Sequence, residues 1–393
     1  MLMSTDYNDI KCIENWDDLD IHRNILRGIY AYGFEKPSPI QKQAITPMLA
    51  KKDLIAQAQS GTGKTGCFTV GTLAVIDTSI PQLQAILLSP TRELAMQTQK
   101  VLNSIGSFDN NLRTQLLVGG ISNEECIYSL TEHPPQIVVG CPGRVYDMLC
   151  RKKILPNTLK LIVLDEADEL LSSGFKEQVY NIFQFMPTDI QVALFSATLP
   201  NELHTLTDKF MRDPVKVLVK AESLTLEGIS QYYIAIENDE QKFDCIKDLF
   251  SSFSMSQCII YCNSVNRVQD LYNAMLRDNF PVGQIHSNMD KEERTNSFEN
   301  FKNGNTRVLI SSNVTARGID VQQVSTVINF DLPMCVHTYL HRIGRSGRWG
   351  RKGIGINFVT RRDNHKLKEI ERHYSTEIVK MPDNWNDTLV NSV

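Results

Sequence analysis

The sequence has no long apolar run and no paired cysteine motif. None of its nine cysteines stands in a Cys-x-x-Cys pair, and the run between Cys258 and Cys262 indicates core packing, so we expect a reducing compartment. No stretch approaches the ~20 apolar residues of a transmembrane helix. The start, MLMSTDYNDIKC, lacks a basic region followed by an apolar one, which argues against a secretory signal. We expect a soluble cytoplasmic monomer with no membrane partner, and a nuclear location is the alternative.

The chain also lacks an excess of positive charge. It has 41 Lys and Arg against 45 Asp and Glu, a formal net charge of −4. Proteins that bind nucleic acid through bulk electrostatics are usually basic. Any binding to nucleic acid must therefore come from a few placed groups.

The length of 393 residues allows two or three domains. Short apolar runs alternate with helical stretches, which predicts βαβ units and parallel sheets covered by helices. The expected strands are residues 54–56, 85–88, 115–118, 137–139, 161–164, 192–195, 215–219, 232–236, 258–261, 308–310, 326–330 and 355–359. We predict the α/β class with two parallel-sheet domains in tandem. An N-terminal arm spans 1–20, the first domain 21–219, a polar linker 220–229 and the second domain 230–393.

A glycine-rich segment, AQSGTGKT at 58–65, follows the first strand. Glycines allow backbone N–H groups to surround phosphate oxygens at a helix N-terminus. In this interpretation Lys64 reaches the β- and γ-phosphates and the Thr65 hydroxyl completes a magnesium shell. Ala58 replaces the first Gly of the general pattern, and the alternative is a loop with an exposed lysine.

A second candidate is LIVLDEAD at 161–168, where a buried strand ends in carboxylates. Ligands of open α/β sheets bind at this strand end. Asp165 is suited to hold magnesium and Glu166 to polarise an attacking water. The alternative is that Asp165 or Asp168 only caps the following helix.

The segment GFEKPSPIQ presents Gln41 after a proline turn. A glutamine amide donates and accepts side by side, as the edge of adenine requires. Trp16 and Phe34 are candidates to stack on the base or pack beside it, and an ordinary helix C-terminus followed by turn residues is the alternative.

Several further loops follow strands on the same expected edge. Thr91 and Arg92 begin a helix and are placed to bind a backbone phosphate, and Gly119-Gly120 and Cys141-Pro142-Gly143-Arg144 stand similarly. Each is weak alone and also fits a capped, solvated helix, but together they predict a track for nucleic acid. Ser196-Ala197-Thr198 is either a helix cap or a coupler between nucleotide and track.

Two arginine-bearing segments stand out in the second half, ARGID at 316–320 and HRIGRSGR at 341–348. Gly344 and Gly347 interrupt any helix, and Arg345 and Arg348 are spaced to converge on one anion. Arginines that reach a transferring phosphoryl group contribute about 10³–10⁵ in rate, although a solvated charge run is the more ordinary explanation.

In order and spacing, AQSGTGKT, PTRELA, GG, PGR, DEAD, SAT, ARGID and HRIGRSGR resemble the motifs of DEAD-box ATP-dependent RNA helicases. The resemblance runs from about Trp16 to the C-terminus. IYAYGFEKPSPIQ, MRDPVKVLVK, LTLEGI and GIDVQQVS further resemble the initiation factor 4A branch of that family, and its exon-junction paralogue is also close.

The resemblance implies two RecA-like domains that bind ATP, Mg²⁺ and single-stranded or short duplex RNA without sequence preference. The phosphate and magnesium residues would be Ser60, Gly61, Thr62, Gly63, Lys64, Thr65 and Asp165. Gln41 would contact adenine, Glu166 activate water, and Asp320 contact ribose. Arg345 and Arg348 would act as arginine fingers. The RNA residues would be Thr91, Arg92, Gly120, Gly143, Arg144, Arg294 and Arg317.

Four sites depart from the pattern of the family. Cys141 stands where Thr is usual, Asn313 where Asp is usual, Ser287-Asn288 for Gly-Asp, and Lys291 for Gln. These changes bear on the strength and ATP dependence of RNA binding, whereas the residues of the ATP site match.

The sequence therefore predicts an RNA-stimulated ATPase that locally unwinds short duplexes in translation initiation, with an initiation scaffold protein as a partner. One alternative is an ATP-locked RNA clamp of exon-junction type with slow turnover. Another is a motif-bearing scaffold without activity.

Overall fold

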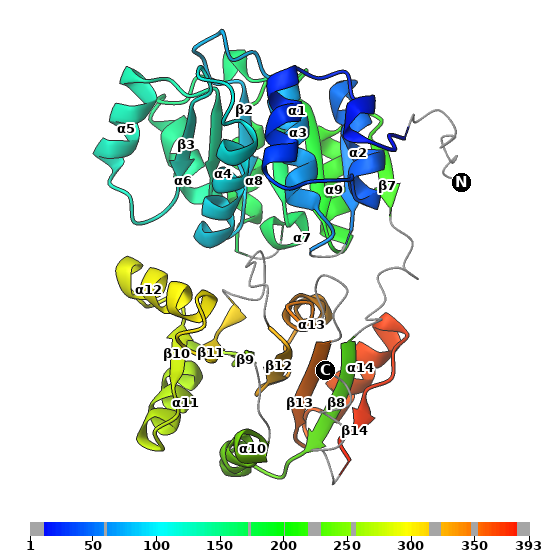
Figure 1. Ribbon diagram of the computed structural model, residues 1–393, viewed down its shortest axis with the longest axis vertical. Helices are drawn as coiled ribbons and strands as arrows, with labels where there is room; N and C mark the ends of the chain where they lie inside the picture. Colours follow the sequence, from blue (N-terminus) through cyan, green and yellow to red (C-terminus); the bar gives the residue numbers. More distant parts are fainter. Residues whose placement is uncertain are drawn as a thin grey trace. The chain divides into compact units, whose positions relative to one another are not determined.

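The computed structural model describes residues 12–58, 61–171, 174–199, 201–218, 229–252, 257–313, 324–346 and 353–382. The chain divides into two compact units, unit 1 at 1–224 and unit 2 at 225–393. Each unit contains one seven-stranded parallel sheet with helices on both faces (Figure 1). The predicted α/β class with two parallel-sheet units is confirmed. Among the described residues, no helix has the length and apolarity to cross a membrane.

Unit 1 alternates strands and helices along the chain. Its elements are η2 (Trp16–Asp18), α1 (Arg23–Ala31), α2 (Pro39–Leu49), β1 (Leu54–Gln57), α3 (Lys64–Val75), β2 (Ala85–Leu88), α4 (Arg92–Ile105), β3 (Thr114–Leu117), α5 (Asn123–Glu132), β4 (Ile137–Gly140), α6 (Pro142–Cys150), η3 (Pro156–Thr158), β5 (Leu161–Asp165), α7 (Ala167–Leu170), α8 (Lys176–Phe183), β6 (Gln191–Ser196), α9 (Asn201–Phe210) and β7 (Val215–Leu218).

The sheet of unit 1 has the order β3-β4-β2-β5-β6-β1-β7. Since side chains alternate along a strand, each strand contributes to two cores: Leu54 of β1 lies in one and Ile55 in the other. Helices α1 to α4 pack on the first core, and α5, α6, α8 and α9 on the second. Burial on both faces is why these strands appear in the sequence as continuous apolar runs.

Unit 2 is built in the same way. Its elements are β8 (Ile229–Ala235), α10 (Asp239–Ser252), β9 (Cys258–Tyr261), α11 (Val265–Arg277), β10 (Val282–Ile285), α12 (Lys291–Lys302), β11 (Val308–Ser311), β12 (Thr326–Asn329), α13 (Val336–Ile343), β13 (Gly353–Val359), α14 (Asn364–Tyr374) and β14 (Val379–Lys380).

The strand order of unit 2, β10-β11-β9-β12-β13-β8-β14, repeats that of unit 1 position by position. In this correspondence β12 is the counterpart of β5, and the β8–α10 connection is the counterpart of the β1–α3 loop. Helices α10 and α11 pack on one core and α12, α13 and α14 on the other. The carboxyl ends of all its strands therefore lie at one edge of the sheet, where ligands of such sheets bind.

Several helices begin at a Ser, Thr or Asp that the sequence places shortly after a strand. The side-chain oxygens of Thr91, Ser122, Ser264 and Asp290 accept from backbone N–H groups three residues onward, at the starts of α4, α5, α11 and α12. Such caps satisfy N–H groups that have no partner within the helix, and each contributes about 1 kcal/mol. The helix starts at the carboxyl edge are thus determined locally.

The structure differs from the expected elements in three places. Residues 12–20, expected in an N-terminal arm, pack on unit 1, because Ile13, Trp16 and Leu19 are buried in its first core. Strands β10 and β14 were not expected; the Gly-Gln pair at 283–284 interrupts the apolar run of β10. Ile229, placed in the linker, begins β8, and the rest of 220–229 lies outside the described residues.

Candidate functional site

The loop between β1 and α3 has a backbone that requires glycine. Gly61 and Gly63 have φ values of +82° and +99°, which L-residues rarely adopt. Gly63 is the N-cap residue of α3, and no side-chain hydrogen bond caps that helix. The first N–H groups of α3 can therefore donate to an anion, which the helix dipole also favours. Thr62 and Thr65 flank this turn and are half-buried, and Ser60 lies outside the described residues.

Lys64 lies between this loop and the acidic end of β5. Its side chain is buried, and its Nζ donates to the carbonyl oxygen of Ala58 at 2.9 Å. The same Nζ is 3.9 Å from Oε1 of Glu166, whose side chain is also buried. The alternative of a glycine-rich loop with an exposed lysine is therefore wrong, because the ammonium group is directed inward toward the carboxylates.

The carboxylates at the end of β5 repel each other in a buried setting. Asp165 is the last residue of β5, and its Oδ1 accepts from the backbone N–H of Glu166 at 3.0 Å. Burial, followed by the charge of Glu166, raises the pKa of Asp165 to about 8, against the opposing effect of Lys64. Two adjacent buried carboxylates destabilise the fold unless a cation or a proton compensates them.

This arrangement makes the stability of the ligand-free protein depend on pH. The folded-state pKa of Asp165 lies above its unfolded value. The contribution of the protonated Asp165 side chain to the free energy of unfolding is therefore fully present below the unfolded pKa and is lost as the pH rises to about 8. We expect Asp165→Asn to raise the free energy of unfolding at pH 8 by about 1–2 kcal/mol and to flatten this decline. Thermal unfolding of both proteins from pH 5 to pH 8 measures the effect. Parallel curves for variant and wild type would contradict the assignment.

The donor groups at this position fit Mg²⁺. The Asp165 carboxylate and the Thr65 hydroxyl are hard oxygen ligands of the kind that this ion prefers. A divalent cation beside the acidic pair would relieve the repulsion that raises the pKa of Asp165. When bound, the ion neutralises charge on phosphate oxygens.

Asp168 connects the acidic stretch to the end of β6. Its Oδ2 accepts from the hydroxyl of Thr198 at 2.8 Å, and its backbone N–H is 3.3 Å from Oγ of Ser196. Ser196 Oγ also donates to the carbonyl oxygen of Thr198 at 2.7 Å. The N-cap residue of α7 is Glu166, in a left-handed conformation and without a side-chain cap bond. Asp165 and Asp168 therefore do not cap α7, and the segment 196–198 is hydrogen-bonded to Asp168, three residues beyond Asp165.

Gln41 is directed at the glycine loop. Its Nε2 donates to the carbonyl oxygen of Gly63 at 3.1 Å, and its Oε1 accepts from the backbone N–H of Ser38 at 2.7 Å. Phe34 stands beside it, stacked on Trp16 with ring centroids 6.1 Å apart. Trp16 has no exposed surface, so it supports Phe34 from within the core. Contacts of Gln41, Phe34 and Trp16 with a base stay predictions.

Gly66 lies against Phe34 and Gln41 and was not among the predicted residues. A Cβ added to Gly66 would lie 2.7 Å from Cε2 of Phe34 and 2.8 Å from Nε2 of Gln41. A glycine inside a helix is otherwise unfavourable, and this was the available signal in the sequence. The missing side chain allows Phe34 and Gln41 to approach the phosphate loop.

We expect Gly66→Ala to weaken ATP binding about tenfold, because the added methyl group displaces Phe34 and Gln41. The turnover rate at saturating ATP should change less, since Asp165 and Glu166 are untouched. Titration with a fluorescent ATP analogue and with a guanosine analogue measures the affinity and the base preference. Gly174→Ala is the matched control, because a Cβ there meets no atom within 4 Å. Equal affinity and base preference in both variants would show that Gly66 has no role at the base.

Loops predicted to hold nucleic acid lie at the carboxyl edge of the unit 1 sheet. The Thr91 hydroxyl caps α4 by accepting from the N–H of Leu94 at 3.3 Å. Nε of Arg92 is buried, and none of the described residues offers it a hydrogen bond. Thr91 therefore caps a helix, which was the alternative to an RNA contact in the sequence analysis. Arg92 retains an N–H donor beside the helix N-terminus.

Arg144 has a structural contact at the same edge. Its Nη1 donates to the carbonyl oxygen of Ile121 at 2.8 Å, which holds the turn after Gly119-Gly120. Gly120 has a φ of +85°, and Gly143 lies beside Gln178 of α8. The RNA contacts of Arg144, Gly120 and Gly143 stay predictions.

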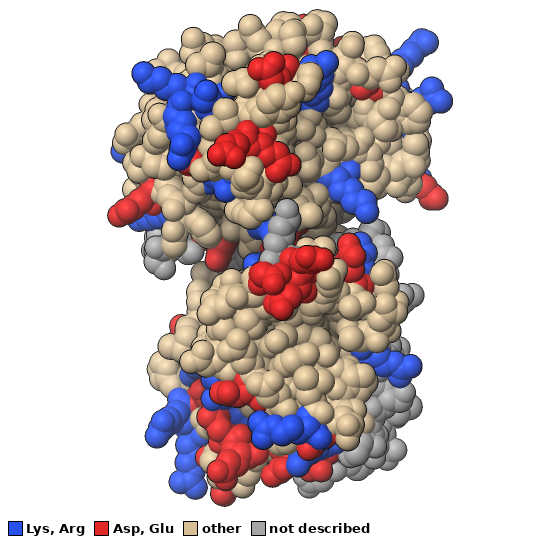
Figure 2. All heavy atoms as spheres, turned by 90° about the vertical axis from the view of Figure 1, so that its left-hand side faces the viewer, with Lys and Arg blue, Asp and Glu red and all other residues tan. Residues whose placement is uncertain are grey.

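The surface charge supports local and not bulk binding. On the face drawn in Figure 2, Lys and Arg gather in small groups that alternate with groups of Asp and Glu in each unit. This agrees with the net charge of −4. Attraction for a polyanion must come from particular edges of the fold.

In unit 2 the structure places Arg294 in α12 and Arg345 just beyond α13. Arg294 lies near buried His286, and its charge adds to the effect of burial in lowering the pKa of that imidazole. As the sequence predicted, α13 ends at Ile343 with Gly344 as its C-cap residue. Arg345 is buried, and its Nε donates to the carbonyl oxygen of His341 at 3.1 Å. The remaining predicted residues, Arg317, Asp320 and Arg348, lie outside the described residues.

A family model described as DEAD/DEAH box helicase matches residues 38–206, and one described as helicase conserved C-terminal domain matches 241–350. The chain is 48% identical over 388 residues to eukaryotic initiation factor 4A of Caenorhabditis elegans, covering 99% of this chain and 96% of that protein. It is also 48% identical over 380 residues to ATP-dependent RNA helicase eIF4A of Saccharomyces cerevisiae, covering 97% and 95%.

A relative named as an initiation factor 4A-III homolog is matched to the same extent. Eukaryotic initiation factor 4A-III homolog A of Oryza sativa is 48% identical over 380 residues, with 97% of this chain and 94% of that protein covered. Among solved structures, S. cerevisiae Dbp5 bound to RNA and ADP BeF3 has a TM-score of 0.90 at 33% identity, covering 97% of this chain and 99% of that one.

Proposed function

Because this chain belongs to the DEAD/DEAH box helicase family, we infer that it is an ATP-dependent RNA helicase. It hydrolyses ATP when RNA binds and separates short RNA duplexes locally, without sequence preference. The reaction is ATP and water to ADP and phosphate.

One observation supports this function above the others. In a single buried site, the ammonium group of Lys64 lies 3.9 Å from the Glu166 carboxylate, and buried Asp165 directly precedes Glu166 in the chain. A scaffold without activity would have no reason to keep two mutually repelling buried carboxylates beside a phosphate loop. The alternative of an inactive scaffold is therefore rejected.

The residues divide the chemistry among themselves. The N–H groups of the Gly61–Lys64 turn and the Lys64 ammonium hold the phosphates, which fixes the γ-phosphoryl group for in-line attack. Thr65 and Asp165 would hold Mg²⁺. Glu166 is placed to orient the attacking water and accept its proton. Asp168 and Thr198 connect this site to the end of β6, so a change there is transmitted to the residue pair at 165–166.

For the cellular role, we propose translation initiation in the cytoplasm, with the protein acting as a monomer beside an initiation scaffold protein. Similarity to initiation factor 4A supports this role. Similarity to an initiation factor 4A-III homolog is of the same size, so the ATP-locked RNA clamp with slow turnover remains the second candidate.

The test is steady-state ATP hydrolysis with and without single-stranded RNA, alongside unwinding of a short duplex. Strong stimulation by RNA with prompt unwinding is expected. A long-lived RNA complex with ATP and little turnover would favour the clamp. No hydrolysis under either condition would reject the proposed function.

A further inference from the structure

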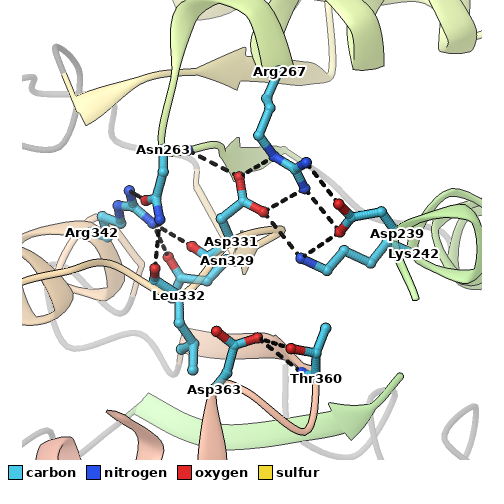
Figure 3. Close-up of polar contacts among 10 residues, drawn as sticks. All are labelled: Asp239, Lys242, Asn263, Arg267, Asn329, Asp331, Leu332, Arg342, Thr360 and Asp363. Atoms are coloured by element: carbon cyan, nitrogen blue, oxygen red, sulfur yellow. Dashed lines mark hydrogen bonds and ion pairs between the residues drawn. The ribbon is translucent and has the colours of Figure 1, made fainter. Parts of the chain in front are cut away.

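A polar cluster lies at the carboxyl edge of the unit 2 sheet (Figure 3), in which Lys242, Asp331 and Arg342 are buried, Arg267 is partly exposed and Asp239 is exposed. We call Asp239, Lys242, Arg267, Asp331 and Arg342 the unit 2 polar cluster. Arg267 donates to Asp331 at 2.6 and 2.7 Å and to Asp239 at 2.9 and 3.1 Å. Nζ of Lys242 lies 3.0 Å from Asp331 and 3.2 Å from Asp239. These two cations and two carboxylates compensate one another.

Arg342 is the exception within the cluster. Its side chain has no exposed surface, and all its N–H groups donate to uncharged oxygens. The acceptors are the side chains of Asn263, Asn313 and Asn329 and the backbone carbonyl of Asp331. Among the described residues, no carboxylate accepts a hydrogen bond from Arg342. Burial lowers the pKa of Arg342 to about 10, against the opposing charge of Asp331, whose backbone carbonyl and not its carboxylate accepts from Arg342.

The unit 2 polar cluster therefore carries an excess of positive charge, because three cations face two carboxylates. A buried charge is screened far less by salt than a surface charge is. Its field consequently extends to ligands bound at the same edge of the sheet.

Asn313 occupies the position where a carboxylate would compensate this charge. Its single Oδ1 accepts from both Nε and Nη2 of Arg342, at 2.9 and 2.6 Å. Those two N–H groups are the parallel pair that matches the two oxygens of a carboxylate. Asn313 is itself exposed, so an aspartate there would keep part of its hydration while pairing with Arg342.

The excess charge lies beside the segments expected to bind phosphates. Asn263, Asn313 and Asp331 follow the carboxyl ends of β9, β11 and β12. Asn313 directly precedes the segment that holds Arg317, and Arg342 precedes Arg345 by one helical turn. A phosphate-bearing ligand at this edge would experience the charge of Arg342 without contacting it.

We propose that Asn313 leaves Arg342 uncompensated and that the resulting positive charge strengthens the binding of RNA phosphates to unit 2. The inference rests on the proposed function, since it names how that site attracts RNA. It also implies that higher RNA affinity comes with lower stability, because the charge that attracts RNA destabilises the fold when no RNA is bound.

The test is Asn313→Asp in the full-length protein, with a fluorescent oligouridylate as the probe and no nucleotide present. The RNA affinity should fall about three- to tenfold. The dependence of affinity on salt should weaken, and the melting temperature should rise by about 2–4 °C. Asn273→Asp makes the same change of charge on an exposed part of α11, near the end of the helix that leads away from this edge, and should leave all three quantities unchanged.

Asn313→Ser removes the acceptor without adding charge, so it should lower the melting temperature and leave RNA affinity within about twofold. The inference is overturned if Asn313→Asp leaves RNA affinity unchanged, or if Asn313→Ser or Asn273→Asp weakens RNA binding equally. A separate titration of each variant with a fluorescent ATP analogue, without RNA, is the second readout, and weakening confined to that titration would overturn the assignment to RNA. If wild-type protein neither binds RNA nor hydrolyses ATP, the proposed function fails instead.

Discussion

Glu166→Gln is expected to leave ATP binding intact and to reduce hydrolysis by about 10²–10⁴-fold. The amide has nearly the shape of the carboxylate but cannot accept a proton from the attacking water. Removal of this charge also removes the second-largest cause of the raised pKa of Asp165, so the ability of Asp165 to hold Mg²⁺ should be retained. RNA should still bind, because Glu166 lies between β5 and α7 and not in the loops of the predicted RNA track.

Single-turnover hydrolysis and titration with a fluorescent ATP analogue separate the two effects. Glu132→Gln removes one carboxylate from the exposed end of α5 and serves as the control. A turnover rate close to that of wild type would show that another group activates the water.

Arg345→Ala is expected to slow RNA-stimulated hydrolysis by about 10³-fold or more, with little change in the affinity for ATP in the absence of RNA. The resemblance implies that Arg345 is an arginine finger, a group that acts on charge that develops only as the phosphoryl group transfers. Arg345→Lys keeps the positive charge but loses the planar fork of donors, so it should recover only a small part of the rate.

Because Arg345 is buried, its truncation can also loosen unit 2. Thermal unfolding of each variant reports this separately from turnover, and Arg372→Ala on the exposed side of α14 provides the matched loss of an arginine. Equal losses of ATP affinity and of turnover would mean that Arg345 only binds the nucleotide.

The phosphate site was predictable because its signals are local in the sequence. Glycines that need positive φ, a following helix and an adjacent lysine stand within 61–64, and an apolar run that ends in two carboxylates is visible at 161–166. The carboxyl ends of parallel strands meet at one edge, so these two segments were expected together, and the structure places Lys64 and Glu166 3.9 Å apart.

Contacts that depend on packing were harder to predict. Trp16 looked like part of a polar arm, but the hydrophobic effect buries it behind Phe34. For Arg144 the sequence predicted an RNA contact, which stays a prediction, but it did not predict that the guanidinium donates to the carbonyl of Ile121, a partner more than twenty residues away. A sequence pattern does not contain such distances.

Taken by itself, the sequence determined the order of the motifs, most of the strands and the residues of the phosphate site, because periodicity, glycine and helix caps act over a few residues. Only the tertiary structure decided which polar groups share a buried environment. Asn263, Asn313, Asn329 and Arg342 come from four separate segments, and they meet because the strands that carry or precede them, β9, β11 and β12, are neighbours in one parallel sheet. The charge that Arg342 retains there is a property of the folded chain, because burial and partners, not residue type, set its electrostatic effect.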